Sequence, residues 1–119
     1  MNELVIKNID IGAINPKDYL PTLPENFCIW LNLLIGHKEK DGGELFQVGV
    51  CTSNWISHQI LMKGYFIPRH MILVEKFDYS SIRGILEKIV SNAERENLQE
   101  SMKILCRYFA WEFEDYQIS

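Results

Sequence analysis

Apolar and polar residues alternate along the first half of the chain in the period of two that is typical of β-strands. Residues 4–11 mix β-branched and polar side chains and predict a first strand that suits a sheet edge. Prolines interrupt residues 15–26, which we expect to form an ordered loop. Residues 27–35 follow, with apolar side chains on one face and Trp30 and Leu34 on the other. Apolar residues on both faces predict a central strand that is covered, at least in part, on both sides.

A hairpin loop is predicted at residues 36–44, because Asp-Gly-Gly at 41–43 supplies the positive φ angles that a tight connection needs. The return strand spans residues 45–52. On this strand Gly49 leaves room for a bulky neighbour, which we expect to be Trp30 across the strand pair. The two strands form the predicted centre of an antiparallel sheet.

The next segment predicts a helical turn followed by another strand. Ser53 is the expected N-cap of a helix that runs to about Met62 and stops at Gly64. Residues 65–77 return to strand character, with residues 71–74 as the apolar centre. A proline in the first part of this strand limits how far its pairing extends.

The second half of the chain changes to the period of an amphipathic helix. Asp78 is the expected N-cap of a first helix, and Asn97 followed by Glu100 opens a second. Strands first and helices last predict an α+β fold, with a mainly antiparallel sheet from the N-terminal two-thirds and two C-terminal helices packed on it. The predicted buried helix positions are Ile82, Ile85, Leu86, Ile89, Val90 and Ala93, then Leu98, Met102, Leu105 and Phe109.

Length and composition add limits to this picture. The chain has 119 residues, 47% of them hydrophobic, which predicts one ordered domain over residues 1–119. With 12 Lys and Arg against 16 Asp and Glu, the net charge is −4, which argues against general binding of nucleic acid. The longest apolar stretch is too short for a membrane span, and the N-terminus lacks a signal-peptide pattern. We expect a cytoplasmic protein without direct nucleic-acid or membrane contact.

Candidate catalytic and metal-binding residues are few. Cys28, Cys51 and Cys106 lie in apolar contexts, and we expect free thiols in a reducing compartment. The histidines lack the spacing of metal ligands. Cys51 with His58 or His70 would make a nucleophile and its base, although a buried strand cysteine is more often inert. We expect no enzyme activity, no cofactor and no metal.

The end of the chain is a first candidate binding site. Residues 111–116 combine three aromatic residues with the acids Glu112, Glu114 and Asp115. If this stretch is extended, Trp111 and Phe113 share a side and dock inward, while Glu112 and Glu114 face outward on the opposite side. The acids either form a recognition surface or belong to a C-terminal strand or turn that anchors the last helix, and the two interpretations are compatible.

The predicted hairpin loop is a second candidate binding site. Glu39, Asp41 and Glu44 alternate there with two lysines. Mixed charges over so short a stretch form either a solvated tip or a surface that steers a basic partner. Trp55 is a further candidate, because a Trp on a short surface helix can be half exposed; its alternative is a place in the core.

Several of these pieces, in this order, resemble a known protein family. They are residues 46–52 (Phe-Gln-Val-Gly-Val-Cys-Thr) leading into Ser-Asn-Trp-Ile at 53–56, then residues 69–74, and finally residues 111–116. With the predicted hairpin core, they resemble the immunity-protein family numbered eight of bacterial polymorphic toxin systems, which include contact-dependent growth inhibition. The resemblance covers residues 25–116.

The resemblance implies a small cytosolic protein that binds the toxic C-terminal domain of a secreted effector and protects the producing cell. Many such toxins are nucleases with basic active surfaces, which an acidic inhibitor complements. We expect a monomer or a weak homodimer without cofactor or metal. The expected toxin-binding residues are Glu112, Glu114 and Asp115, then Glu39, Asp41 and Glu44, with Trp55 as a further contact.

Two other classes of function remain open from the sequence. One is a non-catalytic interaction or regulatory domain with a non-toxin partner, including a homodimer through the first strand. The other is a small hydrolase or transferase that uses Cys51 with a histidine. An exposed strand edge would favour the first class, and unusual thiol reactivity at neutral pH would favour the second.

Overall fold

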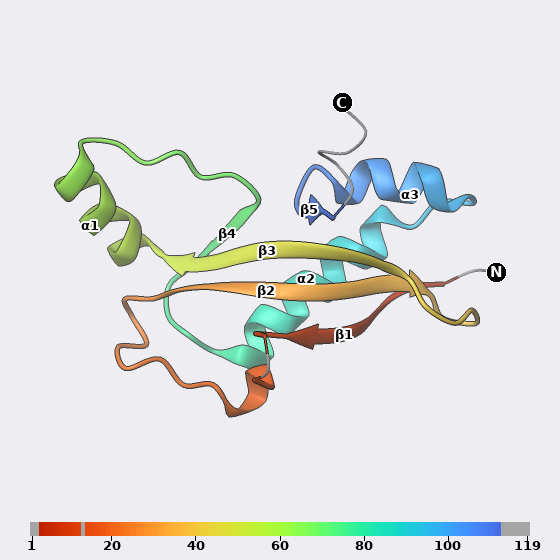
Figure 1. Ribbon diagram of the computed structural model, residues 1–119, viewed down its shortest axis with the longest axis horizontal. Coiled ribbons are helices and arrows are strands. Elements are labelled where there is room, and N and C mark those ends of the chain that lie inside the picture. The colour runs from red at the N-terminus through yellow and green to blue at the C-terminus, as the bar shows by residue number, and fades with distance from the viewer. Residues whose placement is uncertain (1–2, 13, 113–119) are drawn as a thin grey trace.

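The computed structural model describes residues 3–12 and 14–112 as a sheet with two helices on one face and a third helix beyond its end (Figure 1). These elements confirm the predicted α+β fold. The strands are β1 (Leu4–Asp10), β2 (Cys28–His37), β3 (Glu44–Thr52), β4 (Met71–Val74) and β5 (Ala110–Trp111). The helices are α1 (Ser53–Lys63), α2 (Tyr79–Ala93) and α3 (Leu98–Leu105), with a 3₁₀ turn at Pro16–Asp18.

Strands β1, β2 and β3 pair antiparallel in that order, and β1 lies at the predicted edge. Glu94 covers part of this edge, because its Oε1 accepts a hydrogen bond from the backbone N of Leu4 at 2.8 Å. The other edge of β3 is shared by two strands, β4 in parallel and β5 in antiparallel direction. The parallel pair follows from the long connection through α1, which returns the chain to run beside β3 in the same direction.

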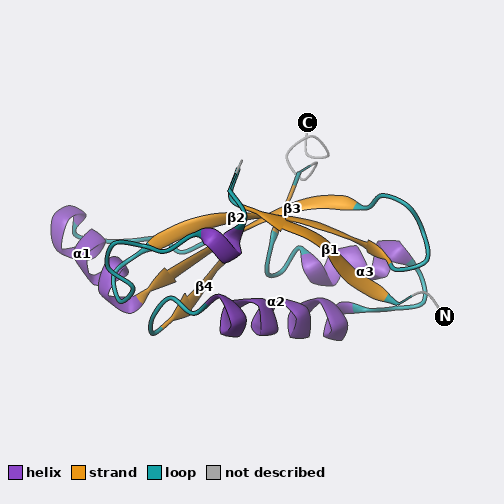
Figure 2. Cartoon of the chain, turned by 90° about the horizontal axis from the view of Figure 1, so that it is seen from below, coloured by secondary structure: helices purple, strands orange, loops and turns teal. Residues whose placement is uncertain are grey.

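The core lies between the sheet and the two helices α2 and α3 (Figure 2). Every second side chain of β2 and β3 points into it. The predicted stripe of α2 is buried except for Ile89, which is half-buried, and Ile85, which is 37% exposed. After α3, Phe109 is fully buried and packs edge-on against Phe46, with ring centroids 6.2 Å apart. This contact fixes the C-terminal helix pair and β5 to the sheet.

The predicted central position of β2 is confirmed, and its second face is covered only in part: no helix of the described residues lies over it, while Cys28, Asn32 and Leu34 there are half-buried. Both α2 and α3 lie on the same side of the sheet (Figure 2). Trp30 points to the opposite side, because its neighbours Ile29 and Leu31 are buried in the core, and it is 45% exposed. Its indole lies across Gly49, its register partner on β3, as predicted. A Cβ atom at Gly49 would come within 3.0 Å of this ring, and the glycine is what lets the indole lie there.

Two local predictions need correction. The N-cap of α1 is Thr52 rather than Ser53, because Thr52 keeps an extended backbone and its Oγ1 accepts a hydrogen bond from the backbone N of Trp55 at 3.3 Å. The strand predicted over residues 65–77 is limited to the four residues of β4. The end of α1 is as predicted, with Gly64 in the left-handed conformation at φ 87°.

Candidate functional site

The uncovered face of the sheet is the candidate functional site. Alternate side chains of β1, β2 and β3 point to this face, and none of the helices in residues 3–12 and 14–112 lies over it (Figure 2). Proteins rarely leave broad apolar surface exposed unless another molecule covers it. The face therefore has the position of a docking surface.

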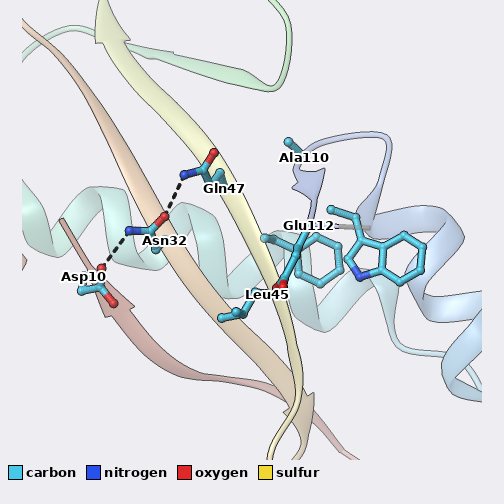
Figure 3. A pocket seen from close by; sticks show the side chains of 8 residues that line it. Asp10, Asn32, Leu45, Gln47, Ala110 and Glu112 are labelled. Carbon is cyan, nitrogen blue, oxygen red and sulfur yellow. Dashed lines mark hydrogen bonds between the residues drawn. The ribbon is translucent and has the colours of Figure 1, made fainter. Parts of the chain in front are cut away.

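A row of polar side chains crosses three strands of this face (Figure 3). Gln47 Nε2 on β3 donates a hydrogen bond to Asn32 Oδ1 on β2 at 2.9 Å, and Asn32 Nδ2 donates to Asp10 Oδ1 on β1 at 2.9 Å. The strand register brings them together, because Asn32 is opposite both Gln47 and Asp10. Since each hydrogen bond orients the next side chain, this polar ladder holds the Asp10 carboxylate in place.

The polar ladder lines a hollow of about 570 Å³. Ala110, Trp111 and Glu112 line the side where β5 joins β3. Glu112 is exposed, and its backbone N donates a hydrogen bond to the backbone O of Leu45 at 3.0 Å. The hollow therefore has one carboxylate from β1, that of Asp10, and a second from the segment after β5.

The part of the face near β4 is apolar. Trp30 is 45% exposed, and Leu73 on β4 is 50% exposed. Met71 is opposite Gly49 in the parallel register, and Gly49 is the residue that the indole of Trp30 crosses. The face thus joins an apolar part to a polar part with two carboxylates, a combination typical of protein–protein contact surfaces.

The predicted hairpin is confirmed, and it carries two of the predicted acids. Glu39 and Asp41 are exposed on the loop between β2 and β3, with Gly42 at φ 75°. Lys7 on β1 holds this loop, because its Nζ donates hydrogen bonds to the backbone O of Lys40 and of Gly42. The two carboxylates are therefore presented on a loop that the sheet ties down.

The other predicted acids have different positions. Glu44 is half-buried at the start of β3, and its Oε1 accepts a hydrogen bond from Trp111 Nε1 at 3.3 Å. This contact joins the hairpin end of β3 to β5 and thereby positions the neighbouring Glu112. Glu114 and Asp115 lie outside the described residues.

Trp55 lies far from these acids. It belongs to α1, at one end of the molecule, whereas the hairpin is at the other end (Figure 1). The longest dimension of the molecule is 46 Å. Trp55 is half-buried and packs edge-on against Phe66, with ring centroids 5.5 Å apart. The structure therefore does not bring Trp55 into one site with the hairpin acids.

Sequence reasoning did not find the polar ladder. Asn32 alone could have pointed to it, because it is a polar residue within an otherwise apolar strand. Asp10 and Gln47 could not be distinguished in the sequence, since polar residues at alternate strand positions are common on any solvated sheet. Their role depends on the register of three strands, which joins residues that are distant in the sequence.

The cysteines do not have the environment of a nucleophile. All three are free, as predicted. Cys51 is fully buried and lies opposite Cys28 on β2. Burial, and to a smaller extent the adjacent Cys28 thiol, raises the pKa of Cys51 to about 11. A reactive cysteine needs the opposite shift, because the thiolate is the attacking form. His58 Nδ1 lies 3.2 Å from Asn26 Nδ2 and is engaged there.

No cluster of three His, Cys, Asp or Glu side chains that could hold a metal ion occurs within the part of the chain that the structure describes. In the same residues, no helix combines the length and the apolar character needed to cross a membrane. What the uncovered face offers is apolar contact area, ordered hydrogen-bonding groups and two carboxylates. These are the means of binding another molecule.

Comparison with known proteins adds one finding. A family model described as immunity protein 8 matches residues 4–116, which is nearly the whole chain. The matched range runs from the first residue of β1 to beyond β5, so it includes every strand of the uncovered face. Neither the comparison with curated proteins nor the comparison with solved structures gives a match.

Proposed function

The chain belongs to the immunity protein 8 family, and from this premise we propose that it binds a cognate toxin domain and neutralises it by occluding the toxin's active surface. The toxin is the C-terminal domain of a secreted effector of a polymorphic toxin system, such as contact-dependent growth inhibition. The protein acts in the cytoplasm of the producing cell, as a single non-catalytic domain over residues 1–119. It needs no cofactor, metal or nucleic acid for this action.

The uncovered face of the sheet carries this proposal. Trp30, Leu45 and Leu73 are each about half exposed on it, at 45%, 47% and 50%. Exposed aromatic and aliphatic side chains next to ordered polar groups are the usual composition of a protein-binding surface. The polar ladder adds fixed hydrogen-bonding groups, which favour a partner of defined shape over a nonspecific one.

The acidic groups around this face support a basic partner. Asp10 and Glu112 line the hollow, and Glu39 and Asp41 extend from the hairpin. A nuclease has a basic active surface because it holds phosphates, and carboxylates in these positions would stand in for the phosphates of its substrate. We therefore propose a nuclease as the toxin, with Glu112, Glu39 and Asp41 in direct contact. Glu44 contributes by positioning the segment that carries Glu112.

Co-expression tests the proposed function. The toxin-sized C-terminal fragment of the product of the neighbouring upstream gene is expressed in bacteria with and without this protein, and growth is followed. We expect the fragment alone to stop growth and the protein to restore it. Growth arrest in both cultures would contradict the proposal for this toxin.

A pair of variants tests the proposed surface. Asp10→Asn with Glu112→Gln removes two charges at the hollow while keeping side-chain size and one acceptor oxygen on each residue. Glu75→Gln with Glu96→Gln removes the same number of charges at exposed positions outside the hollow. We expect the first variant to bind the toxin fragment about tenfold more weakly than the second, measured by titration calorimetry at equal salt. Equal affinities would exclude the hollow as the contact surface.

The rival function is an interaction or regulatory domain with a non-toxin partner, including a homodimer through β1. One observation weighs against the homodimer. The Glu94 carboxylate already accepts the hydrogen bond of the Leu4 backbone N on the outer edge of β1, and a second copy would have to displace it. Sedimentation velocity of the purified protein decides this point, because an edge-to-edge dimer is detected directly.

A further inference from the structure

Two of the three cysteines lie side by side on the uncovered face of the sheet, in the part near β4. Cys28 on β2 and Cys51 on β3 are register partners in the antiparallel strand pair. They belong to the uncovered face because Ile29 and Val50, the next register pair along the strands, are buried in the core. The fold therefore brings together two thiols that residues 29–50 separate in the sequence.

The two cysteines occupy the kind of strand position in which opposite side chains come closest. In the neighbouring pair, the backbone N of Thr52 donates a hydrogen bond to the backbone O of Phe27 at 3.1 Å. Because hydrogen-bonded and non-hydrogen-bonded pairs alternate along an antiparallel ladder, Cys28 and Cys51 form a non-hydrogen-bonded pair. The Cα atoms of such a pair are about 4.5 Å apart. This separation is within the range of about 4.4–6.8 Å that a disulfide spans.

The two thiols differ in acidity and in exposure. Burial raises the pKa of both, that of Cys51 to about 11. The hydrogen bond between the two side chains lowers the pKa of Cys28 and raises that of Cys51, so the Cys51 thiol is its donor. Cys28 is half-buried, whereas Cys51 is fully buried. Cys28 is therefore the thiol that ionises more easily and that a small molecule reaches first.

We propose that Cys28 and Cys51 are an oxidation site, at which hydrogen peroxide converts the two thiols into a disulfide between β2 and β3. The Cys28 thiolate attacks one peroxide oxygen, the O–O bond breaks, and the released hydroxide takes the thiol proton to give water and a sulfenic acid. The Cys51 sulfur then attacks the Cys28 sulfur, the S–O bond breaks, and the hydroxyl leaves as water with the Cys51 proton. Two thiols lose two electrons and two hydrogen atoms, and the peroxide becomes two water molecules.

The chemistry of the pair makes this oxidation slow and reversible. Only the thiolate attacks, so the raised pKa values keep both thiols reduced at neutral pH unless exposure to the oxidant is sustained. Thiol reductants return the disulfide to two thiols by exchange. While it exists, the disulfide closes a loop over residues 29–50 in the unfolded chain, which favours the folded state. The site is independent of the proposed function.

Peptide mapping of the oxidised wild type tests this site. Folded protein is treated with hydrogen peroxide at about pH 9, where more thiolate is present, for about ten times longer than the denatured chain needs for complete oxidation. Remaining thiols are blocked, and the protein is digested without reductant. We expect one linked pair of peptides, which carries Cys28 and Cys51 and separates on addition of dithiothreitol.

The denatured chain is the matched control, because Cys106 also pairs with either cysteine once the fold is lost. Links to Cys106 in the folded protein as frequent as in this control would overturn the proposal. Disulfides between two chains, or no disulfide at all, would overturn it as well.

Single variants test the order of attack. In Cys51→Ala, Cys28 should stop at the sulfenic acid, which dimedone traps, and in Cys28→Ala the buried Cys51 should stay unmodified. Cys106→Ser keeps the pair and should form the same disulfide. Dimedone on Cys51 in folded Cys28→Ala would overturn the assigned order.

Thermal unfolding tests whether the folded strands accept the bond. Oxidation should raise the melting temperature of the wild type by about 10 °C and leave that of Cys51→Ala unchanged. An unchanged or lower melting temperature in the oxidised wild type would mean that the bond distorts the strands, which would overturn the inferred fit.

Discussion

The hairpin end and the α1 end of the molecule expose different chemistry, although strands β2 and β3 run between them. At the hairpin end, Glu39 and Asp41 are carried on a loop that Lys7 holds to the sheet, and Phe109 ties the adjacent β5 to the core. At the α1 end, a helix without buried residues presents exposed apolar side chains. One end is charged and tied to the core, and the other is apolar and stands away from it.

Under the proposed function, the two ends would act over different ranges. Charges on a fixed loop, where Glu39 and Asp41 alternate with Lys38 and Lys40, act beyond the surface, whereas apolar side chains contribute only when water is excluded. The sheet between the two ends carries the proposed contact face. Each of the following predictions tests one part of this comparison.

The largest expected effect concerns the attachment of the hairpin end to the core. Phe109→Ala should lower the free energy of unfolding by about 3–5 kcal/mol, because a fully buried ring is replaced by a cavity. Leu61→Ala near the C-terminal end of α1 should change the free energy of unfolding by less than about 0.5 kcal/mol, since the side chain is exposed. Chemical denaturation measures both. If both variants lose a similar free energy of unfolding, the two ends do not differ in how firmly they are attached to the core.

The next effect concerns the rate of toxin binding. Glu39→Lys with Asp41→Lys should reduce the association rate constant about tenfold at low salt and remove most of its salt dependence, because both carboxylates act at long range. The dissociation rate constant should change little. Stopped-flow mixing at several salt concentrations measures these rates. A change confined to dissociation would mean that these acids anchor the complex rather than guide it.

A smaller effect is expected in the polar ladder between the ends. Asn32→Ala removes two hydrogen bonds of 2.9 Å and should lower the free energy of unfolding by about 1 kcal/mol. Asn8→Ala serves as the control, because it removes one longer contact of 3.3 Å to Asp10. Thermal unfolding of the two variants measures the difference. If Asn8→Ala costs as much as Asn32→Ala, the ladder is not a connected unit.

The smallest effect concerns the pH dependence of stability. The pKa of Cys51 is raised by burial to about 11 in the folded protein, above the ordinary thiol value of 9.0. The folded state therefore favours the neutral thiol, and its advantage is complete below pH 9. As the pH rises from 9 toward 11, the unfolded thiol ionises first and stability falls. Melting temperatures across this range should decline more steeply for the wild type than for Cys51→Ala.

The raised pKa of Cys51 also bears on the hydrolase alternative, which alkylation tests. A nucleophilic Cys51 would have a lowered pKa and would be alkylated rapidly at neutral pH. We expect iodoacetamide to modify it slowly in the folded protein and readily after unfolding. Rapid alkylation in the folded state would revive the alternative.

The fold could be predicted from the sequence where a local pattern determined it. The alternation of residues 27–35, the Asp-Gly-Gly turn and the helical stripe after Asp78 each depend on neighbours in the chain, and each is confirmed. The family resemblance is confirmed as well, by the match over residues 4–116. The exposure of Trp30 could not be predicted in the same way. Apolar residues on both faces of a strand predict cover on both sides, but the pattern does not say how complete that cover is.

The candidate site could be predicted only in part, for a similar reason. Glu39, Asp41 and Glu112 were found because acids in a loop or at an exposed end are visible in the sequence. The ladder from Asp10 to Gln47 was not, because it exists only after three strands align in register. The direct contact of Glu39, Asp41 and Glu112 with a toxin stays a prediction.

The packing of Trp30 on Gly49 has a practical consequence for observing the complex. An indole that lies half exposed on the uncovered face changes its fluorescence when a partner excludes water from it, so the protein contains a natural optical probe at the proposed contact surface. Trp30→Phe keeps an aromatic ring over Gly49 and removes this emission, so comparison with the wild type isolates the signal from those of Trp55 and Trp111. Formation of the complex can then be followed in real time without attaching a dye.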